Sequence, residues 1–264
     1  MTGRSLHDAL LRILTDGELR RRLVAGDPTV ADVIGADEAE HLSRADAERV
    51  RRLARFMARH FYRERIVRLF RYSRALSLAA GHDPLVILES PVFGALLDSA
   101  VLGSPTTADA VARLVEARLT TDLAERPYGA ALVSYEGALF RVEAGPRRWH
   151  ADGAARDGAP ARSRHARIIQ LDWNLTPLIT ALRSGVPSPP DPPREPTRLL
   201  LALSPAGRVT SVRCPEAVSR LLDQLDGRTP LAGIASAAGL GEGEAKAVLE
   251  KLTEIGAVEW RPLR

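Results

Sequence analysis

Histidine and glutamate side chains are the first candidates for chemistry in this chain, because together they can bind metal ions. The six histidines are scattered along the sequence, at His7, His41, His60, His82, His150 and His165. His60 and Glu64 are four residues apart, so on a helix they lie on one face and can share a metal ion or pair with each other. The sequence near them suggests no third ligand, and this favours an exposed pair on a solvated helix face.

A cysteine nucleophile is the second candidate. Cys214 is the single cysteine and stands between Arg213 and Pro215, where a strand is expected to meet a helix. An arginine and a helix start can lower the pKa of a thiol. No histidine partner is evident, however, and we therefore interpret Cys214 as a small buried residue. One cysteine also excludes an internal disulfide framework and a cysteine-based zinc site.

Other catalytic motifs are absent from the sequence. There is no G-x-S-x-G elbow, no Walker loop and no cluster of metal ligands. The glycine-rich stretch GLGEGE, residues 239–244, follows an expected helix and not a strand, so we interpret it as a turn between helices. We therefore expect a chain that is not itself an enzyme and holds no cofactor.

The C-terminal residues predict a winged helix-turn-helix. The first helix begins at Pro215, and Thr229 with Pro230 marks the start of the second. The third helix runs from about Glu242 to Ile255, and AVEW, residues 257–260, follows as a short strand or wing. Apolar residues recur at helical spacing in all three helices, so this part of the chain should have its own core.

Charge on the third helix argues against the usual function of this fold, which is to read DNA. A reading helix needs Lys and Arg to neutralise phosphates. Here Lys246 and Lys251 stand against four glutamates, at positions Glu242, Glu244, Glu250 and Glu254, and residues 195–264 are neutral by formal charge. Nucleic-acid binding by this module is therefore disfavoured.

A peptide is the other ligand that such a module can hold. The stretch TRLLLALSPAGRVTSVRC, residues 197–214, predicts a β-hairpin, and a free hairpin edge can accept an extended peptide as an additional strand. The candidate peptide-binding residues are Arg208, Val209, Thr210, Ser211 and Arg213 on the strand, with Lys246, Leu249, Glu250 and Thr253 on the third helix. Two alternatives stay open: the polar strand residues can simply protect an edge from aggregation, and Leu249 can be a core residue.

These elements predict an α+β protein with an all-helical N-terminal domain, residues 1–144, and a small winged-helix module with a short antiparallel sheet, residues 167–264. The glycine- and arginine-rich residues 145–166 predict a flexible loop. Six prolines between residues 186 and 197 predict an extended linker inside the second domain. No signal peptide or membrane span is expected, which fits a cytoplasmic protein that does not interact with membranes.

The N-terminal domain is the more basic part of a chain whose formal net charge is +4. One long helix is expected from Ser43, as N-cap, to Gly81, with a break near residues 61–66. Eleven arginines lie between Arg44 and Arg74. They fit a solvated face, a docking surface for an acidic protein or peptide (with Arg55, Arg59 and Arg63 as candidates), or a nucleic-acid contact.

Taken together, the hairpin, the three helices and the motif LLDQLDGRTPLAGIA resemble the peptide-recognition element of pathways that modify ribosomally made peptides, the module shared with the pyrroloquinoline quinone peptide chaperone. The stretch from LLRILTDGELRRRLVAGDP to RYSRAL resembles the helical region of partner proteins of multinuclear non-haem iron-dependent oxidative enzymes. This group includes the partner subunit in methanobactin biosynthesis. RPYGAALVSYEGALFRV and IIQLDWNLTPLITALRSG also fit such partners, so the resemblance extends over nearly the whole chain.

The resemblance implies a non-catalytic subunit that forms a heterodimer with an iron-dependent oxidative enzyme, itself TIM-barrel-like. Such a partner holds the leader of a precursor peptide so that the core of the peptide reaches the iron site of the enzyme. The iron is expected in the enzyme and not in this chain. The alternative function is a winged-helix transcriptional regulator that contacts DNA through the arginine-rich helix.

Overall fold

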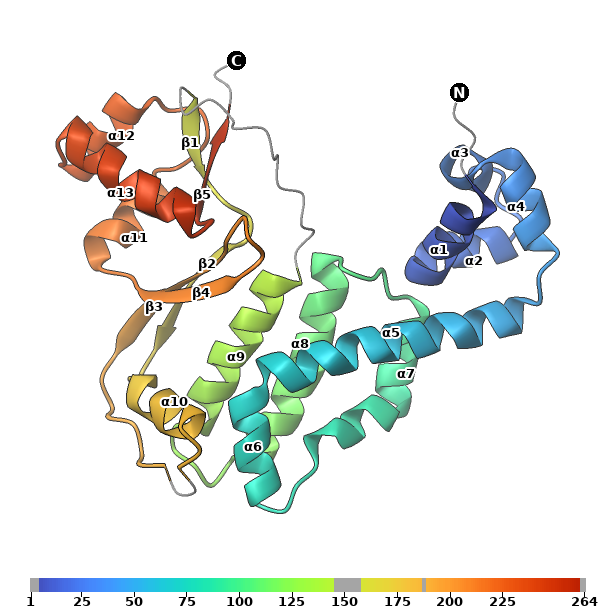
Figure 1. Cartoon of the computed structure of the whole chain (residues 1–264), viewed down its shortest axis with the longest axis horizontal. Coiled ribbons are helices and arrows are strands. Elements are labelled where there is room, and N and C mark those ends of the chain that lie inside the picture. Colours follow the sequence, from blue (N-terminus) through green and yellow to red (C-terminus); the bar gives the residue numbers. More distant parts are fainter. Residues whose placement is uncertain (1–4, 145–157, 187–188, 262–264) are drawn as a thin grey trace. The chain divides into compact units, whose positions relative to one another are not determined.

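The chain folds as an α+β protein, with a mainly helical N-terminal region followed by helices mixed with small antiparallel sheets. The computed structural model describes residues 5–144, 158–186 and 189–261 (Figure 1). Its internal contacts divide the chain into two units, Met1–Leu123 and Ala124–Arg264. The sequence predicts a border after residue 144, whereas the contacts divide the chain before the helix that ends at Glu143.

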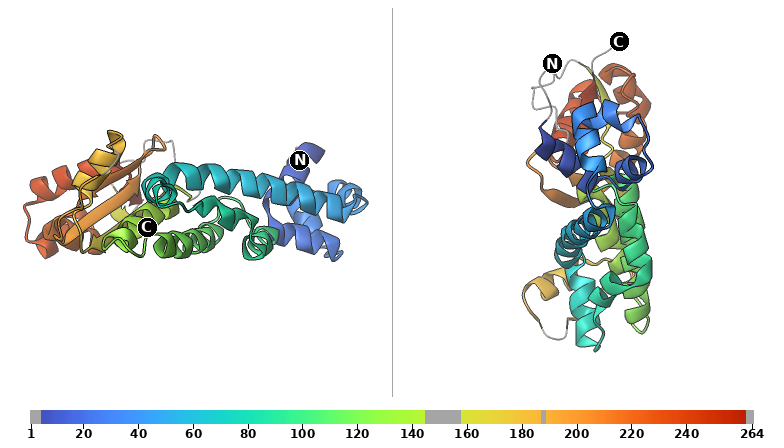
Figure 2. Two further views of the ribbon diagram at one scale, coloured as in Figure 1. Left: turned by 90° about the horizontal axis from the view of Figure 1, so that it is seen from below. Right: turned by 90° about the vertical axis from the view of Figure 1, so that its right-hand side faces the viewer.

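The first unit is built from helices. Its elements are α1 (Leu6–Thr15), α2 (Gly17–Val24), α3 (Val30–Ile34), α4 (Ala36–Ser43), α5 (Ala47–Leu69), α6 (Arg71–Ala79), the 3-10 helix η1 (Pro84–Glu89), α7 (Pro91–Asp98) and α8 (Pro105–Asp122). The four short helices α1–α4 pack together near the start of α5, the longest helix of the unit (Figure 2). Of the helices in the described residues, none is long and apolar enough to cross a membrane.

The long arginine-rich helix starts and breaks at other residues than the sequence predicts. Its N-cap is Asp46, whose carboxylate accepts hydrogen bonds from the backbone N–H groups of Glu48 and Arg49, while Ser43 ends α4. The break falls at Phe70 and not near residues 61–66. The Phe70 side chain is completely buried, and the turn there redirects the chain so that α6 also buries its own apolar side chains.

The second unit contains α9 (Gly129–Glu143), β1 (Ala159–Arg162), β2 (Ala166–Leu171), α10 (Thr176–Arg183), β3 (Thr197–Leu203), β4 (Val209–Arg213), α11 (Glu216–Asp223), α12 (Leu231–Ala238), α13 (Glu242–Glu254) and β5 (Val258–Arg261). Strands β2, β3 and β4 form an antiparallel sheet in that order, and β1 pairs with β5. The predicted hairpin, the three helices and the final strand are therefore confirmed.

One strand appears where the sequence predicts a loop. The residues of β1, Ala159–Arg162, fall within the predicted flexible loop 145–166. They pair in antiparallel register with β5, about a hundred residues later in the chain. Because the sequence Ala-Pro-Ala-Arg has little strand propensity of its own, this pairing with a distant segment determines its conformation. Residues 145–157 of the predicted loop lie outside the described part of the chain.

The three-stranded sheet is covered on both faces. Leu200 and Ala202 of β3 belong to a core shared with α11, α12 and α13, which we call the winged-helix core. Leu201 and Leu203 are also fully buried, and they point to the opposite face because side chains alternate along a strand. Helix α9 packs against β2, β3 and β4, as Figure 1 shows, and covers that face.

A glycine fixes the end of α13 against the sheet. Gly256 has a positive φ of 80°, which ends the helix, and a Cβ atom there would lie 1.9 Å from the carbonyl oxygen of Leu203. Only glycine permits this close approach. The end of α13 is therefore held beside the end of β3, where the β3–β4 hairpin begins.

In the first unit, Asp98 at the end of α7 links helices that are distant in sequence. Arg55 of α5 donates hydrogen bonds to both carboxylate oxygens of Asp98. Arg20 of α2 donates to the backbone oxygens of Asp98 and Ile13, each at 2.9 Å. The hydrogen bonds from Arg55 hold the pKa of Asp98 below its ordinary value.

This pairing gives a testable pH dependence. Because the pKa of Asp98 is lowered by folding, its contribution to stability is complete above the unfolded pKa, about 4, and is lost as the pH falls through the folded value. Replacing Asp98→Asn should lower the free energy of unfolding by about 1 kcal/mol at pH 7, since the pair is a third exposed. Urea denaturation should show that the difference from the wild type disappears in acid.

The matched control is Glu18→Gln, which breaks the exposed pair of Glu18 with Arg21. This change should alter stability little at either pH. An Asp98→Asn variant that loses stability equally at pH 7 and at pH 3 would contradict the role of the Asp98 charge.

Candidate functional site

Strand β4 is an edge of the sheet, and its backbone hydrogen bonds define which residues face outward. The N–H of Cys214 donates to the oxygen of Arg198 at 2.9 Å, and the N–H of Ser204 donates to the oxygen of Arg208 at 2.8 Å. Both contacts belong to the β3–β4 register, in which hydrogen-bonded and non-bonded pairs alternate. The even-numbered positions of β4 therefore bond to β3, and the odd-numbered positions direct their N–H and C=O groups away from the sheet.

The residues whose backbone N–H and C=O groups face outward are Val209, Ser211 and Arg213. No other strand pairs with β4 on this side in the described part of the chain, and no hydrogen bond to their outward backbone groups occurs there. Four of the five sequence-predicted strand residues thus lie together on β4, and Arg208 immediately precedes it as an exposed side chain. An edge of this kind can accept a further strand by backbone hydrogen bonding.

The register separates the side chains of this strand onto two faces. Thr210 and Val212 lie opposite Ala202 and Leu200, so they share the face of the winged-helix core. Val209, Ser211 and Arg213 lie on the face that α9 covers. The polar residues that the sequence grouped together, Thr210 and Ser211 among them, therefore point in opposite directions.

Val212 is a residue that the sequence reasoning missed. Its apolar side chain lies on the sheet face that carries the winged-helix core, opposite Leu200, and 36% of its surface is exposed. A strand added beside β4 would place side chains of its own next to Val212. The two-residue spacing of Thr210 and Val212 is the sequence signal that identifies this face.

The four predicted residues of α13 have different environments. Lys246 is exposed and Glu250 is partly buried. Leu249 is completely buried in the winged-helix core, so a bound peptide cannot touch its side chain in this conformation. Thr253 accepts a hydrogen bond from the indole N–H of Trp260 at 3.1 Å and donates its own hydroxyl to the oxygen of Leu249, so this side chain faces β5.

The candidate docking arginines of α5 are also differently placed. Arg55 is paired with Asp98, and Arg59 is paired with Glu89 at 3.0 Å, so both already bind within the first unit. Arg63 is exposed. His60 and Glu64 form a surface pair at 3.2 Å, with about two thirds of each side chain exposed. In the described residues, no group of three or more histidine, cysteine, aspartate or glutamate side chains lies together as a metal site would require.

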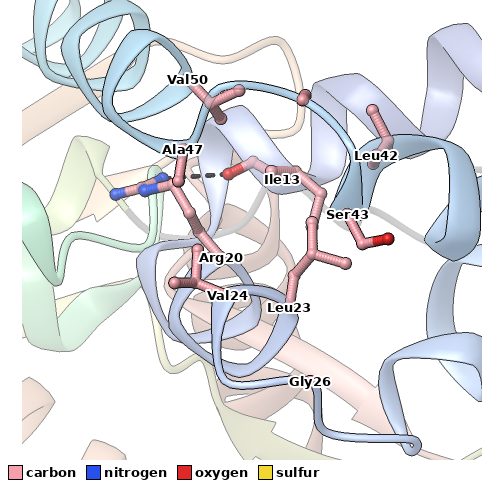
Figure 3. Close-up of a pocket in the computed structure, with 10 residues that line it drawn as sticks. Ile13, Arg20, Leu23, Val24, Gly26, Leu42, Ser43, Ala47 and Val50 are labelled. Carbon is pink, nitrogen blue, oxygen red and sulfur yellow. Dashed lines mark hydrogen bonds between the residues drawn. The ribbon is translucent and has the colours of Figure 1, made fainter.

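A cavity of about 240 Å³ lies in the first unit, between α1, α2, α4 and the start of α5 (Figure 3). Its walls are mainly apolar and include Ile13, Leu23, Leu42 and Val50. Figure 3 shows that Arg20 contributes its aliphatic stem, while its guanidinium donates to the backbone of Ile13. Ser43 also lines the cavity, and its hydroxyl donates to the backbone oxygen of Glu40 at 2.8 Å. This lining offers no set of metal ligands and no base beside the hydroxyl, and we interpret the cavity as a gap in packing.

Comparison with known proteins gives no family for this chain: no protein-family model matches it, and no curated protein has significant similarity to it.

Cys214 is buried, with 4% of its surface exposed, and belongs to the winged-helix core. Burial raises the pKa of its thiol, and the nearby charges of Arg198 and Arg162 act in the opposite direction without reversing the shift. The reactive form of cysteine is the thiolate, so the folded protein should react slowly with thiol reagents.

This expectation is directly measurable because the chain has a single cysteine. At pH 8 the reaction of Cys214 with Ellman's reagent should be at least about tenfold slower in the native protein than in urea. The denatured protein serves as the internal control. A native thiol that reacts as fast as the denatured one would show that Cys214 is accessible and activated.

Proposed function

We propose that this protein is a non-catalytic, cytoplasmic peptide-recognition subunit of a pathway that modifies ribosomally made peptides. It binds the leader of a precursor peptide as an additional strand on β4 and presents the peptide to an iron-dependent oxidative enzyme, with which it forms a heterodimer. The iron belongs to the partner enzyme. The observation that carries this proposal is the outward backbone of Val209, Ser211 and Arg213, which has no partner in the described part of the chain.

Backbone hydrogen bonds provide affinity for an extended peptide but do not select its sequence. Selection would come from side chains on the two faces of the added strand. Val212 and Thr210 favour small or apolar residues on one face, and Arg208 favours a carboxylate near the hairpin end. Arg213 already pairs with Glu195 at 3.3 Å, so it is less available to the peptide.

DNA binding by the winged helix has weaker support. The exposed glutamates Glu242 and Glu244 occupy the first turn of α13, where a DNA-reading helix makes its base contacts. Carboxylates at this position repel phosphate. Salt dependence separates the two functions, since DNA binding weakens steeply between 50 and 200 mM salt and strand addition depends on salt much less.

A proline at an outward position tests the proposed function. Ser211→Pro removes one outward N–H without removing a hydrogen bond to β3, and edge strands tolerate proline. The variant should keep its circular dichroism spectrum but bind a fluorescein-labelled leader peptide, taken from a precursor gene beside its own, at least about tenfold more weakly. Fluorescence anisotropy measures this affinity.

Two controls accompany this variant. Ser211→Ala keeps the backbone N–H and should bind the peptide within about twofold of the wild type. Thr210→Pro removes an inward hydrogen bond to β3 and should destabilise the hairpin itself. Equal binding by Ser211→Pro and the wild type would refute strand addition on β4, and the absence of any wild-type binding would refute peptide recognition.

A further inference from the structure

The outer face of α5 exposes large apolar side chains that the fold does not use. Phe56 is 70% exposed and Leu53 is 46% exposed. The buried face of the same helix consists of Ala54, Ala58, Tyr62 and Ile66, which pack into the first unit. A phenylalanine that stays exposed in the folded state contributes little hydrophobic stabilisation to folding. Its burial against a partner would stabilise a complex.

Three arginines lie on the same face as these apolar residues. At 100° per residue, Arg49, Arg52 and Arg63 fall with Leu53 and Phe56 inside one stripe about 100° wide. All three are exposed, and the described residues include no ion pair with any of them. Arg59 borders this stripe and Arg55 lies farther round the helix, and both are paired with carboxylates of the unit.

Composition makes this stripe different from a solvated helix face. Single exposed apolar residues are common on protein surfaces and need no explanation. Aromatic residues surrounded by arginine, however, are the composition enriched at the centres of protein interfaces. We call the five residues Arg49, Arg52, Leu53, Phe56 and Arg63 the α5 outer stripe.

Charge determines which partner fits the α5 outer stripe. A second copy of this chain would bring three arginines against three arginines, because a two-fold interface places the same patch against itself. Carboxylates near the stripe are already paired: Glu48 with Arg51, Glu89 with Arg59 and Glu64 with His60. Like charges in contact repel each other, so self-association is disfavoured and a partner surface with carboxylates is favoured.

We propose that the α5 outer stripe is the docking surface of this chain for its partner enzyme, and that it fits an apolar depression surrounded by carboxylates. This inference rests on the proposed function, because it takes the iron-dependent oxidative enzyme as the partner. Phe56 and Leu53 fill the depression, and the three arginines pair with its acidic rim. The surface is distinct from the peptide-binding strand β4, which belongs to the other unit.

The test uses the full-length chain co-expressed with the iron-dependent oxidative enzyme encoded beside it. Phe56→Ala should weaken the complex at least about tenfold in surface plasmon resonance, as truncation of a central aromatic residue does. The double variant Arg52→Glu/Arg63→Glu should weaken it further at low salt. Both should bind the leader peptide like the wild type, because β4 is unchanged.

Matched controls change similar side chains elsewhere in the first unit. Leu78→Ala truncates an exposed apolar residue of α6, and Arg113→Glu reverses an exposed charge of α8. Neither should affect enzyme binding by more than about twofold. Circular dichroism of each variant checks that the helices remain folded, and alanine at position 56 is itself a good helix former.

The outcomes separate this inference from the proposed function. If the Phe56→Ala variant and the double variant both bind the enzyme as tightly as the wild type does, the docking surface is overturned and the proposed function stays intact. A wild-type chain that binds the leader peptide but no enzyme would overturn the docking surface and the heterodimer. Loss of duplex-DNA binding, and not of enzyme binding, in the double variant would assign the stripe to nucleic acid.

Discussion

Strand β3 must bury both of its faces and both of its edges. Leu200 and Ala202 point into the winged-helix core, Leu201 and Leu203 point to the opposite face, and none of the four side chains is more than 1% exposed. Its backbone is satisfied by β2 on one side and β4 on the other. Because an apolar strand of this kind is stable only between two layers, α9 must cover one face and α11–α13 the other. The outer strands then carry the only edges of this sheet.

The edge on β4 combines protection against aggregation with capacity for a ligand. It is five residues long and contains Thr210, Ser211 and Arg213, which make it short and polar as protected edges are. Val212 and the three outward backbone positions have the opposite property, since they leave apolar surface, and donors and acceptors without a partner among the described residues, at one place. A strand that only had to resist aggregation would gain from a charged residue in place of Val212. In the proposed function, the polar side chains limit aggregation at this edge until an extended peptide covers it.

Local sequence signals predicted most elements of the second unit, because those elements depend on neighbouring residues. Pro215 marks the start of α11, Thr229 and Pro230 precede α12, and the glycine-rich residues 239–244 separate α12 from α13. Long-range contacts were not predictable. β1 exists through its pairing with β5, which lies about a hundred residues later, and the packing of α9 on the sheet depends on strands that follow it. At the candidate site, the sequence identified the strand, whereas only the register shows which residues face outward and that Val212 belongs among them.

Arginine has two different environments in the first unit, and its sequence spacing does not reveal which applies. Arg20 and Arg55 hold helices together by hydrogen bonds to Asp98, so these two side chains stabilise the fold itself. Among the described residues, no carboxylate pairs with the arginines of the α5 outer stripe, and in the proposed complex their charge acts on the partner. In the proposed complex, charge and apolar surface act on different rate constants. Electrostatic attraction raises the association rate and is screened by salt, whereas burial of Phe56 mainly slows dissociation. A docking surface with both properties allows fast encounter with an acidic partner and a complex that lasts because the aromatic side chain leaves water.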